Sequence, residues 1–160
     1  MKPRRHWWVW IIVGFYIWFI FHNSMQVAEA SNQASIKVTW WVINHLQKFG
    51  VYTDFNVFHH YVRKAAHFLE FGGLGFLVTL AFTLCPIFPH WSLNFLLFLF
   101  AIPFADETLQ KYVSGRSGQV SDMIIDASGF VMGGFACYLF VLVVRDIGRH
   151  LLPHAERDGD

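Results

Sequence analysis

The chain has 160 residues, of which 55% are hydrophobic and 14% are charged, and its formal net charge is +1. Soluble domains carry about 25% charged residues, so this composition excludes an ordinary water-soluble domain and indicates a protein that lies mainly in lipid. The small net charge offers no general attraction to nucleic acid, which we exclude as a partner. Cys85 and Cys137 lie in apolar stretches without the spacing of a metal-binding pair, so we expect two buried free thiols.

The first apolar segment covers about residues 7–22 and follows Lys2, Arg4 and Arg5. A basic start before an apolar core is also typical of a secretory signal. This core, however, is rich in Trp, Tyr and Phe, and Ala28-Glu29-Ala30 is the only small-residue site nearby. We therefore predict a retained membrane span.

A polar interval follows, and its segment 34–49 mixes apolar residues with polar ones. Trp40 and Trp41 stand there beside residues such as Lys37 and His45. This pattern predicts a short helix lying in the membrane interface, with the tryptophans at the level of the lipid headgroups. A helix that caps the bundle without touching lipid fits the pattern equally well.

Three further apolar segments cover about residues 62–84, 93–110 and 123–144. Each is close to the ~20 helical residues that cross the hydrocarbon core of a bilayer. Backbone groups that face lipid must be satisfied within their own helix. We therefore predict an all-α polytopic membrane protein: one domain over residues 1–160, a four-helix transmembrane bundle, an interfacial helix between the first two spans, and a polar tail over 149–160.

The basic residues that flank the spans predict the orientation, because Lys and Arg are enriched in cytoplasmic loops. An even number of spans places both termini on one side, and that side and the opposite side carry six basic residues each. The terminal side holds Lys2, Arg4, Arg5, Arg145, Arg149 and Arg157, and the opposite side holds Lys37, Lys48, Arg63, Lys64, Lys111 and Arg116. Four of the latter belong to a cluster with acidic partners, and the first helix usually dominates, so we predict that both termini are cytoplasmic.

Ionisable residues gather at one end of three predicted spans. They are Arg63, Lys64, His67 and Glu70 on the second span, Asp106, Glu107 and Gln110 on the third, Asp122 and Asp126 on the fourth, and Arg116 in the glycine-containing loop GRSG. Within each span they recur at helical intervals of three or four residues, so each helix presents a polar stripe. Glycines stand beside these stripes, including the pair Gly129 and Gly133, and they would let the second and fourth helices approach closely.

The stripes have two interpretations. Ion pairs that lock three helices would explain some of the charges, because a charge inside a membrane is costly unless it is paired. So many titratable groups around one histidine favour a functional site instead.

The motifs RKAAHFLEFGGLGFL, DETLQ, GRSG and DMIIDASGFVMGG, taken in that order, resemble the VanZ-like family of small bacterial membrane proteins. The resemblance covers about residues 61–134, and the segment HNSMQVAEASNQAS is similar to the serine-rich segment of that family. Phe71 departs from the pattern, since the family often carries a tyrosine there. The resemblance implies a multi-pass protein of the bacterial cytoplasmic (inner) membrane with a role in the cell envelope, and the family name comes from a glycopeptide resistance cluster with a member linked to teicoplanin susceptibility.

We therefore hypothesise a site for a membrane lipid or a lipid-linked envelope precursor. The expected catalytic group is His67, Asp106, Glu107, Asp122 and Asp126, and the expected substrate-binding group is Arg63, Lys64, Glu70, Gln110 and Arg116. In this hypothesis His67 exchanges protons and is oriented by Asp106 or Glu107, while Arg116 binds a phosphate or carboxylate.

Three alternatives stay open at this point. A divalent cation could be held by Asp122, Asp126 and Glu107, because hard cations prefer oxygen ligands. The protein could instead be a non-catalytic envelope ligand-binding or accessory protein, so whether it is an enzyme is undecided. A small transporter ranks last, because the ionisable groups lie at one end rather than at the midplane.

Overall fold

A computed structural model describes residues 6–26, 28–86, 90–116 and 119–151, and these residues form five α-helices and no strand. The helices are α1 (Trp8–Ser24), α2 (Ala28–Lys48), α3 (Phe55–Leu84), α4 (Trp91–Gln110) and α5 (Val120–Leu151). The all-α class predicted from the sequence is confirmed.

Three of these helices, α3, α4 and α5, are long and apolar enough to cross a membrane. The apolar helix α1 has 17 residues, which is about 25 Å at 1.5 Å per residue. Large apolar side chains such as Phe100 and Phe104 on α4, and Phe135 and Phe140 on α5, are exposed on the outside of the molecule. The apolar surface fits the lipid environment that the composition predicts.

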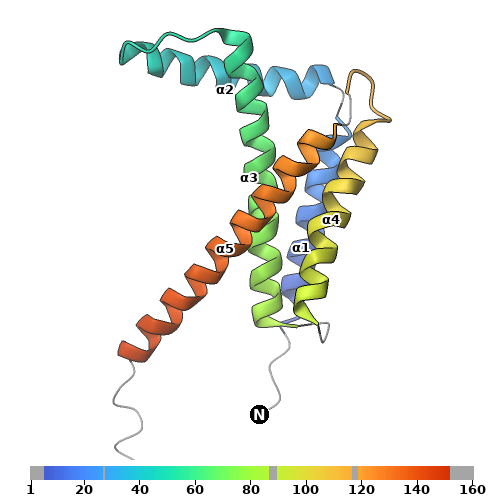
Figure 1. Cartoon of the computed structure of the whole chain (residues 1–160), viewed down its shortest axis with the longest axis vertical. Helices are drawn as coiled ribbons and strands as arrows, with labels where there is room; N and C mark the ends of the chain where they lie inside the picture. Colours follow the sequence, from blue (N-terminus) through green and yellow to red (C-terminus); the bar gives the residue numbers. More distant parts are fainter. Residues whose placement is uncertain (1–5, 27, 87–89, 117–118, 152–160) are drawn as a thin grey trace, which may run out of the picture.

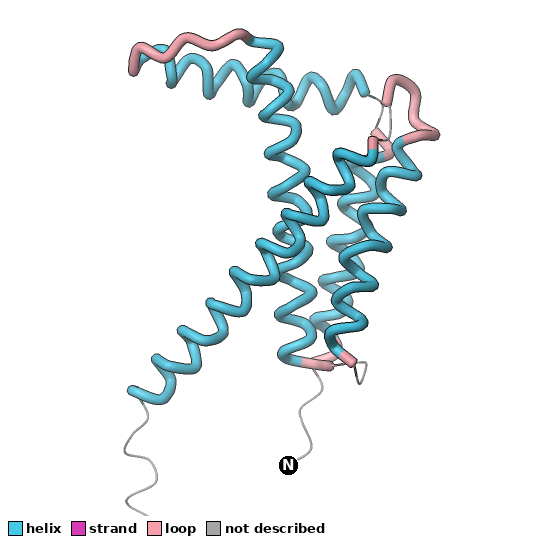
Figure 2. The backbone as a smooth tube through the Cα atoms, viewed as in Figure 1, coloured by secondary structure: helices cyan, strands magenta, loops and turns pink. Residues whose placement is uncertain are grey.

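The helices pack around α3. Figure 1 shows α1 and α4 beside the lower half of α3, α5 crossing α3 diagonally, and α2 lying across the upper end. Figure 2 shows that the α2–α3 and α4–α5 connections lie at this upper end and the α3–α4 connection at the opposite end. We call the end where α1 and α4 finish and α5 begins the polar end.

Two helices extend beyond the predicted spans. α3 begins at Phe55 rather than near residue 62, because the Asp54 side chain caps it by accepting hydrogen bonds from the backbone N–H groups of Asn56 and Val57 at 2.9 and 3.2 Å. α5 continues to Leu151 and therefore includes Arg149, which we had assigned to the polar tail. The rest of that tail and the basic residues before His6 lie outside the described residues.

α2 begins at Ala28, earlier than the predicted start at residue 34. Its buried residues Thr39 and Ile43 face α3, while Trp41 is exposed and Trp40 stacks on Phe55 with ring centroids 4.9 Å apart. One face of α2 thus packs on α3, and the opposite face carries the exposed ring of Trp41.

Close packing between α3 and α5 forms the centre of the molecule. Gly75, Gly129 and Gly133 lie where an added Cβ would collide with a backbone carbonyl of the facing helix, those of Phe130, Phe68 and Gly72. Fully buried apolar side chains, Phe71, Leu74, Val78 and Phe130, fill the space around this contact. The glycines predicted to allow close approach therefore do so.

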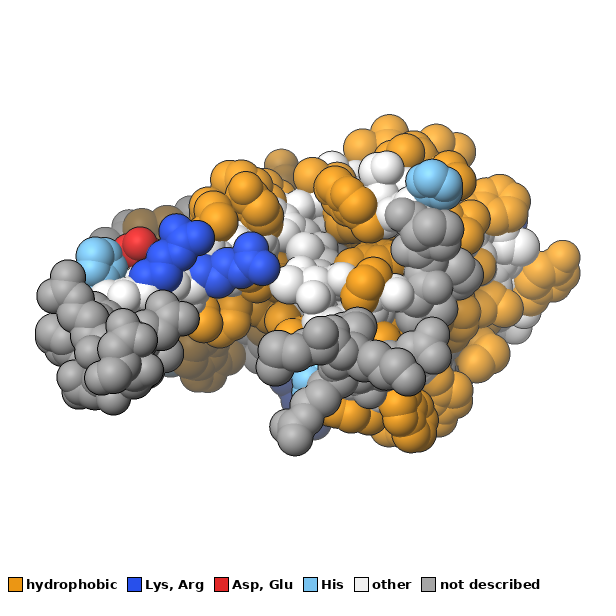
Figure 3. All heavy atoms as spheres, turned by 90° about the horizontal axis from the view of Figure 1, so that it is seen from below, with side chains coloured by type: hydrophobic (Ala, Val, Ile, Leu, Met, Phe, Trp, Pro, Cys, Tyr) orange, Lys and Arg blue, Asp and Glu red, His pale blue; other side chains and the backbone are white. Residues whose placement is uncertain are grey.

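The end opposite to the polar end is mainly apolar. Figure 3 views the molecule from this end and shows basic and acidic side chains with a histidine gathered on one lobe, over the end of α5, while the other lobe is mainly apolar and carries a further histidine. Arg145, Asp146, Arg149 and His150 are exposed in the last turns of that helix.

Candidate functional site

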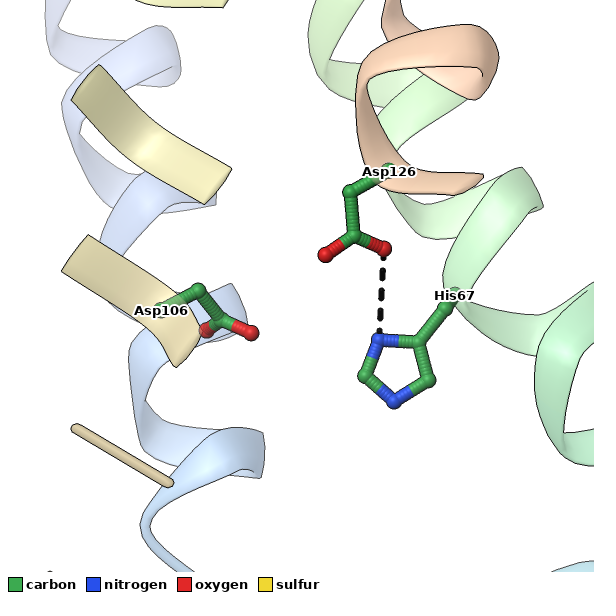
Figure 4. A group of neighbouring side chains, drawn as sticks. All are labelled: His67, Asp106 and Asp126. Carbon is green, nitrogen blue, oxygen red and sulfur yellow. Dashed lines mark ion pairs between the residues drawn. The ribbon is translucent and has the colours of Figure 1, made fainter. Parts of the chain in front are cut away.

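Three side chains from three helices meet near the polar end. His67 of α3, Asp106 of α4 and Asp126 of α5 point into one space, as Figure 4 shows. One potential ligand atom from each lies within 4.8 Å of the others. His67 Nδ1 is 3.5 Å from Asp126 Oδ1, and both aspartates are fully buried. The sequence prediction that three helices bring ionisable groups together is borne out for these residues.

Gln110 orients Asp106 within the group. The two residues are four apart on α4, and Gln110 Nε2 donates a hydrogen bond of 2.8 Å to Asp106 Oδ2. Both side chains are buried, and Ser24 at the end of α1 interacts with the same carboxylate. Asp106 is therefore held from one side, while its Oδ1 atom has no hydrogen-bond partner within the described part of the chain.

Glu107 is directed elsewhere. Its Oε2 atom accepts a hydrogen bond of 2.8 Å from the backbone N–H of Gln119, which connects the end of α4 to the start of α5. We expected Asp106 or Glu107 to orient His67, and this expectation needs correction because the ion pair of His67 is with Asp126. Adjacent residues on a helix point about 100° apart, so Asp106 and Glu107 cannot both face His67.

A second group connects α1, α3 and the α4–α5 loop. Asn23 Nδ2 donates to Glu70 Oε1 at 2.9 Å, and Arg116 Nη2 donates to the Asn23 carbonyl oxygen at 3.2 Å. The loop turns at Gly115, whose φ of 79° is accessible mainly to glycine. Gly118, the other glycine of the motif, lies outside the described residues.

Arg116 is a partly buried cation. Burial lowers the pKa of its guanidinium, and the nearby charge of Arg63 lowers it further. Arginine nevertheless stays protonated in proteins. Its Nε atom is buried and has no hydrogen-bond partner among the described residues, so the guanidinium retains donor capacity.

Two cavities adjoin these groups. The larger has a volume of about 560 Å³. Its walls combine apolar and polar residues from α1, α2, α3 and the α1–α2 connection with the loop arginine: Asn23, Ser24, Gln26, Ser35, Val38, Val42, Val62, Arg63, Ala65, Ala66, His67, Leu69, Glu70 and Arg116.

The smaller cavity has a volume of about 150 Å³ and a mostly polar wall. It is lined by His60, Arg63, Lys64, His67, Gln110, Gly115, Arg116, Gln119, Asp122 and Ile125. His67, Arg63 and Arg116 line both cavities, so they lie between an amphipathic space and a basic one.

Most of the predicted site residues lie near the polar end, either in the buried group of three or in the walls of the two cavities. Lys64 and Asp122 line the smaller cavity and are not members of the buried group of His67, Asp106 and Asp126. Within the described residues, this buried group has one ion pair, His67 with Asp126, and no Lys or Arg lies within 4.0 Å of its carboxylates.

The sequence interpretation missed two contributions from α1. Asn23 contacts both Glu70 and Arg116, and the Tyr16 hydroxyl donates to the Glu70 carbonyl oxygen at 3.1 Å. The run of polar residues that ends the first apolar segment, His22-Asn23-Ser24, was a usable signal. α1 and α4 end at the polar end and α5 begins there, so the polar residues at the C-terminal end of α1 lie beside those of its neighbours.

The model of the VanZ/LLP1 family matches residues 8–142. No curated protein matches the chain, and no solved structure does. The matched region contains α1 to α4, most of α5 and both groups of polar residues. The chain is a membrane protein that belongs to the VanZ/LLP1 family.

Proposed function

We propose that this protein binds, and acts on, an anionic amphiphile of the bacterial cell envelope, a lipid or a lipid-linked precursor. The observation that carries the proposal is the larger cavity, which combines apolar walls with two arginines and His67 in one space of about 560 Å³. A ligand with an apolar chain and an anionic headgroup matches both parts.

The apolar part would take a hydrocarbon chain. Val38 and Val42 of α2 line one side, and Val62, Ala66 and Leu69 of α3 line the other. A chain that enters from the bilayer already lies in an apolar environment, so these walls would position it while the charged part supplies the preference for the ligand. The small side chain of Ala66 leaves room that a larger residue would fill.

The charged part would take the headgroup. Arg63 and Arg116 line both cavities, and Lys64 adds a cation to the smaller one. Arginine binds phosphate or carboxylate through parallel hydrogen bonds, and the buried, unpartnered Nε of Arg116 is free to take part. Two cavities that share these arginines would hold the chain in one and the headgroup in the other.

The proposed membrane placement uses α1 as a fourth span beside α3, α4 and α5. The polar end then faces the extracytoplasmic side, and the arginines at the end of α5 face the cytoplasm with both termini, in the cytoplasmic membrane. α2 lies across the polar end and lines the larger cavity with Val38 and Val42. In the membrane interface, α2 would place the cavity at the depth of the headgroups.

His67 is the proposed proton-transfer group. Its ring adjoins both cavities and is paired with Asp126, and a histidine oriented by a carboxylate is suited to general acid–base work. A purely structural ion-pair network would instead require contacts between the carboxylates and Lys or Arg. The one ion pair in the described part of the buried group is the His67–Asp126 pair. This supports a functional site rather than ion pairs that only hold the helices together.

The proposal is tested by lipid retention. The purified protein is stripped of lipid and supplied with equal amounts of phosphatidylglycerol and phosphatidylcholine, and native mass spectrometry counts the bound molecules. We expect the wild type to retain the anionic lipid preferentially. Arg116→Gln should lower this preference about tenfold, which corresponds to ~1.4 kcal/mol. Arg145→Gln, at the exposed end of α5, is the matched control and should behave as the wild type.

Equal retention of both lipids by the wild type would contradict the proposal, as would equal losses in the two arginine variants. We also propose that this protein alters susceptibility to the glycopeptide teicoplanin, as the family resemblance implies, and this is tested by expressing the wild type and Arg116→Gln in a susceptible bacterium. We expect a change in the inhibitory concentration only with the wild type.

A further inference from the structure

We propose that His67, Asp106 and Asp126 form a binding site for one divalent transition-metal ion, with Zn²⁺ as the probe that fits the donors best. The site stands on its own geometry. Only the idea that the bound ion would lie beside a lipid headgroup rests on the proposed function.

The donors come from three helices and surround one space (Figure 4). Their potential ligand atoms lie within 4.8 Å of one another, and the closest measured contact is 3.5 Å, from His67 Nδ1 to Asp126 Oδ1. A tetrahedral zinc ion bound at about 2.0–2.2 Å holds its ligands roughly 3.3–3.6 Å apart. A small inward movement of the side chains would complete this coordination.

The donor atoms have no other partners in the described part of the chain. Both oxygens of Asp126, the Oδ1 atom of Asp106 and the Nδ1 atom of His67 are buried without a hydrogen bond. Asp106 and Asp126 are fully buried. Buried polar groups are almost always satisfied, and these four atoms have only the 3.5 Å contact between His67 Nδ1 and Asp126 Oδ1 among them, so they keep the capacity to bind a ligand.

The surroundings of Asp106 support the same conclusion. Gln110 donates to Asp106 Oδ2, which leaves Oδ1 as the atom that points at the group. A neighbour that binds one oxygen of a carboxylate and orients the other is the usual support of a metal ligand.

Charge and donor type select the kind of ion. His67 would bind the ion as a neutral imidazole, so metal binding would replace its ion pair with Asp126 and leave two carboxylates with a charge of −2. No Lys or Arg of the described residues lies within 4.0 Å of these carboxylates. A divalent cation balances that charge. The imidazole nitrogen favours a transition metal over magnesium or calcium, which prefer all-oxygen sites.

This ligand set differs from the one expected from the sequence, Asp122, Asp126 and Glu107. Asp122 is partly exposed and lies outside the buried group, and Glu107 Oε2 is occupied by the backbone N–H of Gln119. Asp126 is the one residue common to both sets.

The first measurement uses the wild-type full chain, purified in detergent without a polyhistidine tag. It is stripped with a chelator, titrated with ZnCl₂ and analysed for metal after desalting. We expect about one zinc per chain and a higher unfolding temperature. X-ray absorption should show only nitrogen and oxygen ligands near 2.0–2.1 Å, because Cys85 and Cys137 are not in the site. Zinc below about one-tenth of an ion per chain, or a sulfur shell near 2.3 Å, would overturn the proposal.

Variants then assign the ligands. Asp126→Asn should abolish stoichiometric zinc, and Gln110→Leu should weaken zinc binding about 10–100-fold by freeing Asp106. Asp146→Asn, an exposed change of the same type on the same helix, should bind as the wild type. Equal zinc binding by Asp126→Asn and Asp146→Asn would overturn the assignment. If Asp126→Asn does not fold, the wild-type spectrum and Gln110→Leu decide.

Lipid retention measured on the same preparations separates the two proposals. Preferential retention of phosphatidylglycerol without zinc uptake overturns the metal site and leaves the proposed function standing. Zinc uptake without lipid preference supports the metal site and overturns the proposed function.

Discussion

Replacing Gln110 by leucine tests the buried hydrogen bond that orients the centre of the site. In the wild type, Gln110 Nε2 donates to Asp106 Oδ2 at 2.8 Å, with Gln110 5% exposed and Asp106 0% exposed. Asp106 Oδ1 already lacks a hydrogen-bond partner among the described residues. Leucine keeps the apolar packing of the stem but leaves both oxygens of Asp106 without the amide donor.

The size of the effect follows from the charge and burial of the acceptor. A hydrogen bond to a charged group contributes about 1.5–3 kcal/mol. One kcal/mol corresponds to about 2–4 °C in the unfolding temperature of a chain of this length, so Gln110→Leu should lower that temperature by about 3–12 °C.

Thermal unfolding in detergent measures this change, and the 7 tryptophans provide an intrinsic fluorescence signal. Gln47→Leu, on an exposed position of α2, is the matched control and should cost less than about 0.5 kcal/mol. In an Asp106→Asn background, the effect of Gln110→Leu should shrink because the charged acceptor is gone. Equal effects of Gln110→Leu and Gln47→Leu, or an unchanged effect in that background, would refute the reasoning.

Two further variants test the helix packing and the start of α3. Gly133→Ala puts a Cβ against the Gly72 carbonyl and should destabilise the protein by about 1–3 kcal/mol. Gly14→Ala, with no atom within 4 Å of the added Cβ, is the control and should not destabilise it. Similar unfolding temperatures of the two variants would contradict the close α3–α5 contact. Asp54→Ala removes the cap of α3 and should destabilise the protein by about 1 kcal/mol and speed hydrogen exchange in the first turn of that helix. Asp54→Asn keeps a capping side chain and should preserve the protection from exchange. An unchanged exchange rate in Asp54→Ala would mean that the cap contributes nothing.

The helices were predictable because a run of ~20 apolar residues has few other structures in lipid. The start of α3 was missed because its first two turns, FNVFHHY, mix apolar residues with Asn56, His59 and His60, and the clear signal there is the capping residue Asp54 rather than a continuous apolar run. The close α3–α5 contact was predictable from glycines at helical spacing, since only small residues permit it.

The site was predictable as a region and not as a set of contacts. Helical spacing placed His67, Asp106 and Asp126 on polar faces near one end, but it gives no information about how each helix is rotated toward its neighbours. That rotation pairs His67 with Asp126 and turns Glu107 toward the α4–α5 loop. Asn23 binds Arg116 through its backbone carbonyl, a contact that side-chain type does not predict.

The central claim is that the larger cavity holds an anionic amphiphile, and blocking the cavity tests it most directly. Ala66→Phe places an aromatic ring where Ala66 lines the cavity, and Ala136→Phe makes the same change at an exposed position of α5. Native mass spectrometry of protein supplied with phosphatidylglycerol measures retention. We predict that the wild type and Ala136→Phe retain the lipid and that Ala66→Phe loses it. Equal retention by both phenylalanine variants would contradict the account.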